Sequence, residues 1–300
     1  MHRRAFIKSA VLAGAALSLP TGFAPFVRRL EAAGPPDLVV VQGASPAGIT
    51  RAAVDGLGGI RRFVSRGAVV VVKPNIGWDR TPEYAANTNP EVVATVVRLC
   101  YEAGAKTVKV FDHPVADARR TYKQSGIADA AAAAGAAVRF VDERKFKDMQ
   151  INGLALKSWP LYTEAIEADA IINLPIAKTH GISGLTLGMK NWMGVMGGSR
   201  RTIHQRLDES LVDLSMAIKP TLTILDAVRI LTANGPQGGS LSDVKKMDTV
   251  IVGVDQVAVD SFGATLFGMK GSDLEYVNIG DRAGLGRMDI SKLNVKRINV

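Results

Sequence analysis

The sequence predicts an α/β fold, with a mostly parallel sheet, helices on both of its faces and a small β-hairpin insertion. Apolar segments rich in Val and Ile recur along the chain without strict alternation, which is typical of strands buried on both faces. Segments of helical length and pattern separate them, and this alternation favours a parallel sheet. No repeat of about 20 to 50 residues and no linker interrupts the pattern, so we expect one domain over residues 34–300.

The expected elements follow one another along the chain as strands and helices in turn. The strands are the apolar runs at 38–41, 69–73, 107–112, 138–141, 170–174, 222–226 and 249–254. The helices are expected at 49–65, 90–103, 126–134, 161–168, 203–218 and 256–267.

Local signals mark two of these elements clearly. The helix at 90–103 has Asn89 as a capping residue, Pro90 at its first position and a glycine after its end. The hairpin is predicted at 149–157, because Asn152-Gly153 is a pair that forms tight turns.

The N-terminal segment resembles a twin-arginine targeting signal. Arg3-Arg4 is followed by Phe6 and Lys8, then by an apolar run of about ten residues and Pro20. Such a run is half of the ~20 residues that a membrane-spanning helix needs, so we expect no permanent span. We therefore predict a signal peptide at 1–33, the twin-arginine export machinery as a partner, and a periplasmic or other extracytoplasmic location, at the membrane if the signal is retained. An ordinary secretory signal is the alternative.

Charge and cysteine content exclude several classes of function. The formal net charge is +9, from 37 basic and 28 acidic residues, and removing five basic and one acidic residue with segment 1–33 leaves +5. This mild charge, without a basic run, argues against a nucleic-acid partner. Cys100 is the only cysteine, which excludes an intrachain disulfide and an all-cysteine metal or iron-sulfur site.

Polar clusters follow three of the predicted strands, at the edge where open α/β sheets bind ligands. Lys73 and Asn75 follow the strand at 69–73, and Asp226 ends the strand at 222–226, with Asn234 in the glycine-rich loop beyond it. Another strand end carries Asp112-His113, which could line the same crevice or form a turn.

The cluster after strand 170–174 is the richest. It holds two lysines, a histidine, hydroxyls and several glycines, and its candidate residues are Lys178, Thr179, His180, Lys190 and Asn191. Glycine lets backbone N–H groups approach a ligand, and lysine adds positive charge, so the combination suits a phosphate or carboxylate. The spacing matches neither the phosphate-binding loop nor the dinucleotide fingerprint.

These residue types predict roles in binding and proton transfer. The ligand-binding candidates are Lys73, Asn75, Thr179, Lys190, Asn191 and Asn234. The catalytic candidates are Lys178 to hold the anion, His180 to exchange a proton, and Asp226 to orient a lysine or a cation. Solvated lysines, and Asp226 as the cap of a turn, are the alternatives. His180 has no second histidine at metal-ligand spacing, so no metal site is predicted.

Several of these segments together resemble the domain-of-unknown-function family 362. They are Lys73-Pro74-Asn75, the run 173–194, Asp226-Ala227 and Asn234-Gly235-Pro236. The resemblance extends from about residue 37 to the C-terminal strand and implies no defined activity. Some members of the family are fused to ferredoxin-like iron-sulfur modules, which implies a redox function. Because Cys100 is the only cysteine of this chain, the resemblance implies that any such cluster would belong to a partner protein.

Two functions remain open from the sequence. One is an exported enzyme acting on a small anionic molecule. The other is a binding or accessory protein that captures such a ligand, or assists the maturation of an exported redox enzyme with an iron-sulfur partner. Folded export favours a bound cofactor, but the sequence does not identify one.

Overall fold

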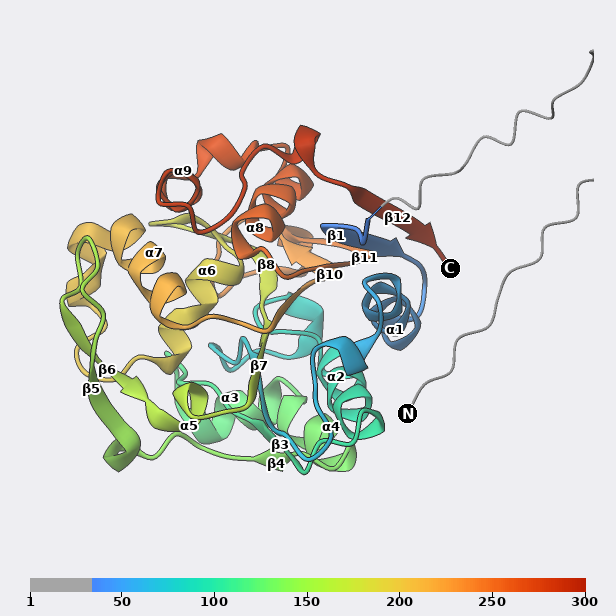
Figure 1. The fold of residues 1–300 in the computed structure, drawn as a ribbon, viewed down its shortest axis with the longest axis horizontal. Coiled ribbons are helices and arrows are strands. Elements are labelled where there is room, and N and C mark those ends of the chain that lie inside the picture. Colours follow the sequence, from blue (N-terminus) through green and yellow to red (C-terminus); the bar gives the residue numbers. More distant parts are fainter. Residues whose placement is uncertain (1–33) are drawn as a thin grey trace, which may run out of the picture. The chain divides into compact units, whose positions relative to one another are not determined.

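A ten-stranded sheet in which nearly all strands run in one direction forms the centre of the chain (Figure 1). The fold comes from a computed structural model that describes residues 34–300; the predicted signal at 1–33 lies outside the described residues. The order of the main path is β12 (Val295–Asn299), β1 (Leu38–Gln42), β11 (Val244–Gly253), β10 (Leu222–Leu231), β7 (Ala170–Leu174), β2 (Val69–Pro74), β3 (Thr107–Val110) and β4 (Ala137–Val138).

The pairing confirms the predicted mostly parallel sheet. Along the main path every neighbouring pair is parallel except the two pairs made by β11, with β1 and with β10. Two further strands, β8 (Ile176–His180) and β9 (Gly184–Thr186), lie off the path, and β8 pairs in parallel with β10. The sequence missed both, because their polar residues are typical of a loop.

Helices cover both faces of the sheet, as predicted (Figure 1). One face packs against α1 (Pro46–Gly56), α2 (Pro90–Glu102), α3 (Ala118–Gln124) and α4 (Ile127–Ala133). The other packs against α5 (Thr163–Ile166), α6 (Gly188–Asn191), α7 (Leu207–Ala217), α8 (Gln256–Ala264) and α9 (Glu275–Arg282). Successive residues of β2 alternate between these faces: Val70 and Val72 pack toward α1 and α2, and Val71 toward α6 to α9.

Three helices differ from their predicted bounds. The helix predicted at 49–65 begins earlier, because Ser45 caps it, and ends before Gly58 and Gly59, which both adopt positive φ. The helix predicted at 161–168 is reduced to α5, because residues 158–162 form a strand. The helix predicted at 203–218 begins as a 3-10 turn at Thr202–Arg206 and becomes α-helical only in α7.

Four strands also differ from the prediction, among them β3, which ends two residues before the predicted 112. β10 extends five residues past Asp226, to Leu231, and β11 begins at Val244, five residues before the predicted start, because these two long strands pair along most of their length. The predicted strand at 138–141 is reduced to the short edge strand β4.

The predicted hairpin is present but wider than expected. Strands β5 (Phe146–Gln150) and β6 (Ser158–Tyr162) pair antiparallel in a sheet of their own, and Asn152 adopts positive φ in the loop between them. The carboxylate of buried Asp213 accepts hydrogen bonds from the backbone N–H groups of residues 154, 155 and 156, at 2.7 to 2.8 Å. The loop is therefore fixed to α7.

Strand β10 changes partner along its length. Its first residues pair with β7, and from Asp226 onward it pairs with β8. Pro175 separates β7 from β8, while β2 pairs with β7 only as far as Pro74 opposite Leu174. Beyond this point β2 and β8 are not hydrogen-bonded to each other, and a crevice opens between their ends.

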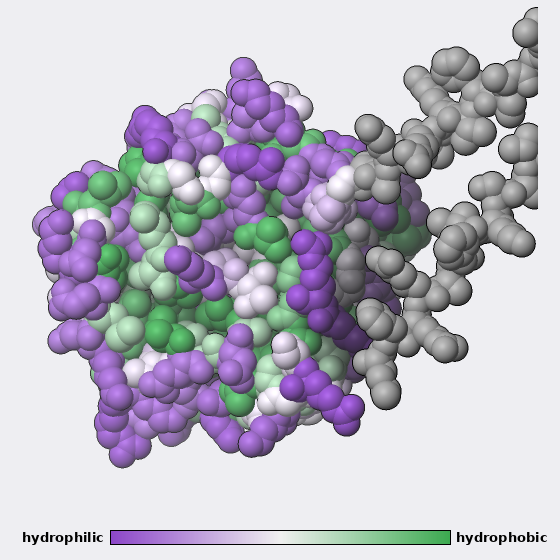
Figure 2. Space-filling view, in the orientation of Figure 1, coloured by the Kyte–Doolittle hydropathy of each residue, from purple (hydrophilic) through white to green (hydrophobic). Residues whose placement is uncertain are grey.

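Hydrophilic side chains dominate the outline of the molecule, and apolar side chains gather toward the middle of the face shown in Figure 2. Within residues 34–300, no helix combines the length and apolar character needed to cross a membrane.

Candidate functional site

A cavity of about 470 Å³ opens where β2, β3 and β8 end. Its wall contains five cationic side chains but one carboxylate, and the charged residues are Lys73, Lys178, Lys190, Arg200, Arg201 and Asp112. Three histidines, His113, His180 and His204, also line it. The position agrees with the general rule that open α/β sheets bind ligands beyond the carboxyl ends of their strands.

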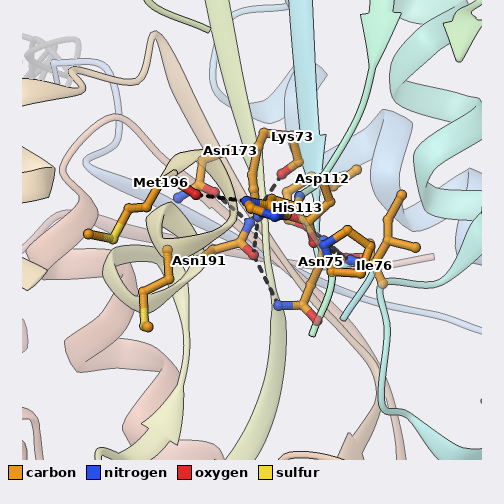
Figure 3. A network of polar contacts seen from close by, with 12 residues as sticks. Lys73, Asn75, Ile76, Asp112, His113, Asn173, Asn191 and Met196 are labelled. Atoms are coloured by element: carbon orange, nitrogen blue, oxygen red, sulfur yellow. Dashed lines mark hydrogen bonds and ion pairs between the residues drawn. The ribbon is translucent and has the colours of Figure 1, made fainter. Parts of the chain in front are cut away.

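Lys73 forms the centre of a buried polar network beneath the cavity (Figure 3). Alternation along β2 places its side chain on the same face as Val71, toward α6. Its Nζ lies 2.8 Å from Asp112 Oδ1 and 2.8 Å from Asn191 Oδ1, and the side chain is fully buried. Burial lowers the pKa of Lys73, and the ion pair with Asp112 opposes that shift.

Asn191 connects the lysine to its neighbours (Figure 3). Its Oδ1 accepts hydrogen bonds from Lys73 Nζ and Asn75 Nδ2, the latter at 3.1 Å. Its Nδ2 donates to the Lys73 carbonyl at 3.1 Å and to Asn173 Oδ1 at 2.9 Å. All the amide's polar atoms are therefore engaged, which fixes the orientation of the side chain.

Asp112 is also fully engaged. Oδ1 pairs with Lys73 and accepts a hydrogen bond from the His113 N–H at 2.9 Å, while Oδ2 accepts one from the Ile76 N–H at 2.6 Å. Gly194 lies directly against this ion pair: a Cβ at that position would lie 1.8 Å from Asp112 Oδ1 and 2.5 Å from Lys73 Nζ. The close approach requires glycine here.

Lys178 differs from Lys73 because it has no carboxylate partner within residues 34–300. Its Nζ donates to Asn75 Oδ1 at 3.0 Å and to the carbonyl of Ala86, and the residue is 1% exposed. Burial lowers the pKa of Lys178 to about 7; the charge of Asp112 opposes this shift, and the charges of Lys190 and Lys73 reinforce it. This amine therefore changes its protonation state near neutral pH.

Lys190 and Arg200 add further charge without a carboxylate in the part of the chain that the structure describes. Lys190 Nζ contacts Met193 Sδ at 2.8 Å, and burial with the nearby Arg200 lowers the pKa of Lys190 to about 8. The Arg200 guanidinium donates only to backbone carbonyls, those of His113, Pro114 and Met193. Asp208 acts on Lys190, and Asp112 and Glu143 act on Arg200, only at longer range, so within residues 34–300 neither cation forms a direct ion pair.

His180 lies in the cavity wall as a neutral ring. The backbone N–H groups of Ile182 and Ser183 point at its Nδ1, at 3.1 and 3.4 Å, so the ring proton resides on Nε2. Burial, with the charges of Lys190 and Lys178, lowers the pKa of His180 to about 3. Such a ring suits donation of a hydrogen bond, and Lys178 is the better placed of the two to exchange a proton at neutral pH.

The structure brings most of the predicted site residues together but not all of them. Lys73, Asn75, Lys178, His180, Lys190 and Asn191 line the cavity. Asp226 lies on the opposite face of the sheet, where its carboxylate accepts hydrogen bonds from the backbone N–H groups of Asn89 and Val228, at 2.7 and 2.9 Å. It holds the backbone of Asn89, the N-cap of α2, and lies inside β10 instead of capping a turn after that strand.

Thr179 and Asn234 lie outside the cavity wall and support it. Thr179 Oγ1 accepts a hydrogen bond from the Gly235 N–H at 3.2 Å, and Asn234 Nδ2 donates to Asp243 at 3.0 Å. Both fix the Gly235-Pro236 segment, which does line the cavity.

Sequence reasoning missed several contributors to the site. Asn173 was seen only as part of a motif, and Arg200, Arg201 and His204 follow the predicted cluster in sequence. The signal that could have found the arginines is their adjacency at 200–201, shortly after Gly197-Gly198, in a segment otherwise without helical pattern. Within residues 34–300 there is no group of three or more His, Cys, Asp or Glu side chains that could hold a metal ion.

The sequence match to known families agrees with the position of this cavity. A model of the family described as domain of unknown function DUF362 matches residues 70–265, a span that contains all the residues of the cavity wall. The chain belongs to the DUF362 family. The match begins inside β2, so β1 and α1 before it, and α9 and β12 after it, lie outside the matched range.

Similar proteins extend the match beyond the DUF362 segment. A thylakoid-associated protein, sll1697, of Synechocystis sp. is 30% identical over 245 residues, which cover 78% of this chain and 74% of that protein.

Two solved structures show weaker similarity. The lactate racemase apoprotein from Thermoanaerobacterium thermosaccharolyticum gives a TM-score of 0.49 at 10% identity, over 76% of this chain and 56% of that one. A Thermotoga maritima protein gives 0.39 at 15% identity, over 74% and 58%. This DUF362 chain therefore spans less than two thirds of either structure, and at these TM-scores neither bears on its ligand or activity.

Proposed function

We propose that this DUF362 protein is an enzyme that acts on a small anionic molecule bearing a phosphate or carboxylate group. The supporting observation is the positive charge of the cavity: Lys178, Lys190 and Arg200 lie in its wall without a carboxylate partner among residues 34–300. Burial of a charge without a counter-charge is costly. A bound anion would give these cations the direct ion pair that Asp112, Glu143 and Asp208 do not form with them.

The geometry supports a separate role for each group in binding the anion and in proton transfer. Lys190 and Arg200 attract the anion, while the network of Lys73, Asp112 and Asn191 keeps the wall rigid beneath it. Lys178 gives or takes a proton, because its pKa of about 7 leaves both forms populated at neutral pH. The Nε2–H of His180 donates a hydrogen bond to negative charge on the ligand.

Calorimetric titration of the full chain with four anions tests this proposal: phosphate, acetate, phenyl phosphate and phenylacetate. At pH 6.5 at least one should bind, and Lys178→Met or Lys190→Met should weaken it by roughly tenfold or more, about 1.4 kcal/mol. Lys147→Met is the matched control, because Lys147 is exposed on β5 and should leave the affinity unchanged. If none of the four binds, or if both cavity variants bind like Lys147→Met, the proposal fails.

The affinity should also depend on pH. Raising the pH from 6.5 to 9 removes the proton from Lys178, whose pKa is about 7, and from much of Lys190, whose pKa is about 8. Binding of acetate or phenylacetate, whose own charge stays constant from pH 6.5 to 9, should therefore weaken over this range, and Lys178→Met should flatten the dependence. Affinity that rises with pH would contradict the assigned role.

Export by the twin-arginine route is a second part of the proposal, supported by the sequence of residues 2–20. Replacement of both Arg3 and Arg4 by lysine should retain the protein in the cytoplasm, as followed by cell fractionation. Continued export of that variant would favour the ordinary secretory route.

A further inference from the structure

Three apolar side chains lie in the solvent-exposed part of the cavity wall. Val115 and Ile182 both line it, and they are 66% and 63% exposed. The half-buried indole of Trp78 also lines it. We call Trp78, Val115 and Ile182 the apolar rim. Single exposed apolar residues need no explanation, but three at the entrance of one cavity do.

Backbone hydrogen bonds hold the apolar rim in place. The Gly77 carbonyl accepts hydrogen bonds from the N–H groups of Val115 and Ala116, both at 3.2 Å, which joins the loop after β2 to the loop after β3. The Trp78 backbone exchanges two hydrogen bonds with the side chain of Asn87, at 3.0 and 2.7 Å. The rim on this side is therefore preformed.

Ile182 is fixed in the turn between β8 and β9. Its N–H donates to His180 Nδ1, so the residue that exposes an apolar side chain also orients the histidine of the charged wall. The hydrogen bond between Ile182 and His180 thus connects the apolar rim to the charged wall.

The size of the cavity also bears on the ligand. At about 470 Å³ it falls within the range of ~300 to 1,000 Å³ found for sites of organic ligands. An inorganic anion at the lysines would fill a small part of it and leave the apolar rim in water.

We infer that the ligand is an organic anion with an apolar group, whose charge lies at Lys178 and Lys190 and whose apolar group packs against Trp78, Val115 and Ile182. This inference rests on the proposed anion binding and names its ligand class. Burial of the rim side chains against the apolar group would add free energy to that of the charge contacts.

The four anions of the titration separate the two contributions. The affinity for phenyl phosphate should exceed that for phosphate by roughly tenfold or more, because the phenyl ring buries apolar area against the apolar rim. The affinity for phenylacetate should exceed that for acetate for the same reason. Val115→Ser should reduce this preference severalfold and leave the affinity for phosphate unchanged, and Ile182→Ser should reduce the preference as well. Leu241→Ser is the control, because Leu241 is 53% exposed and does not line the cavity.

The possible results distinguish the inference from the proposal beneath it. Equal affinity for the phenyl and the inorganic anions overturns the inference and leaves anion binding in place. A preference for the phenyl ligands that survives both rim substitutions overturns the assigned position. Failure of all four anions to bind overturns the inference together with the proposed function. Phenol, which has the ring without the charge, should bind more weakly than phenyl phosphate, and equal binding would overturn the role of the lysines.

Discussion

At the scale of single residues, the polar groups of the cavity divide into those engaged with each other and those left for a ligand. Lys73 and Asp112 neutralise each other, whereas Lys178 and Lys190 have amide, carbonyl or thioether partners only among residues 34–300. The sequence could predict that Lys73 and Lys178 follow strands and that Lys190 belongs to the cluster after 170–174. It could not predict which one is paired, because Asp112 and Lys73 come from different strands.

Asp226 was predicted to belong to the site, but it does not line the cavity. It follows a strand like the other candidates, but alternation along β10 places Ile224 and Asp226 on the face of α1 and α2, and Leu225 on the face of the cavity. From the sequence, alternation shows that Asp226 and Leu225 point to opposite faces. It does not show which of the two faces holds the cavity.

We predict that Asp226→Asn lowers stability without affecting the cavity. An amide can accept from only one of the two backbone N–H groups that the carboxylate satisfies, at Asn89 and Val228, and its own NH2 would face the other. The loss should be about 1–3 kcal/mol in urea unfolding. Anion affinity should stay within twofold of the parent chain in the titration, and a tenfold loss would return Asp226 to the site.

At the scale of elements, the site depends on the break between β7 and β8. The sequence predicted β7 from its apolar run, but β8 carries Lys178 to His180 and reads as a loop. Its strand conformation comes from pairing with β10, about 50 residues later in the chain, and such long-range pairing leaves no local signal. Most residues of the predicted cluster therefore line the cavity, but their local structure is a strand where a loop was expected.

A second element, the 3-10 turn Trp192–Val195, covers the buried network. We predict that Gly194→Ala forces apart Lys73 and Asp112, because its Cβ would meet both side chains. The free energy of unfolding should fall by about 1–3 kcal/mol or more, and anion binding should weaken with it.

Gly181→Ala is the matched control for that change. Gly181 also lines the cavity, but a Cβ there would have no atom within 4 Å, and the residue has no positive φ. It should fold and bind like the parent chain. Equal behaviour of the two alanine variants would show that the close approach at Gly194 does not matter.

At the scale of the whole molecule, the sequence predicted the α/β class and missed the order of the strands. The apolar runs predicted seven strands of the sheet, but nothing local indicates that β1 lies between β11 and β12. The family match confirms the resemblance read from the motifs, which were long enough to be specific.

The buried lysines also affect the stability of the whole molecule. Their pKa values in the fold, about 7 for Lys178 and about 8 for Lys190, lie below the ordinary value of 10.5 that they regain on unfolding. Between pH 7.5 and 9.5 the unfolded chain therefore holds more protons, and the free energy of unfolding should rise with pH, on the order of a few kcal/mol. Urea unfolding at both pH values measures this. Lys178→Met should reduce the rise, and a fall in stability over this range would contradict the burial of uncompensated charge.

The position of β1 has a consequence for synthesis. Leu38–Gln42 pairs on one side with residues 249–253 and on the other with residues 295–299, so the strand closest to the start of the described chain obtains both partners only after almost all of it has been translated. Until the last strand leaves the ribosome, β1 presents unpaired backbone groups that chaperones or other chains could bind. The pairing of β1 is therefore completed only once β12 has been synthesised.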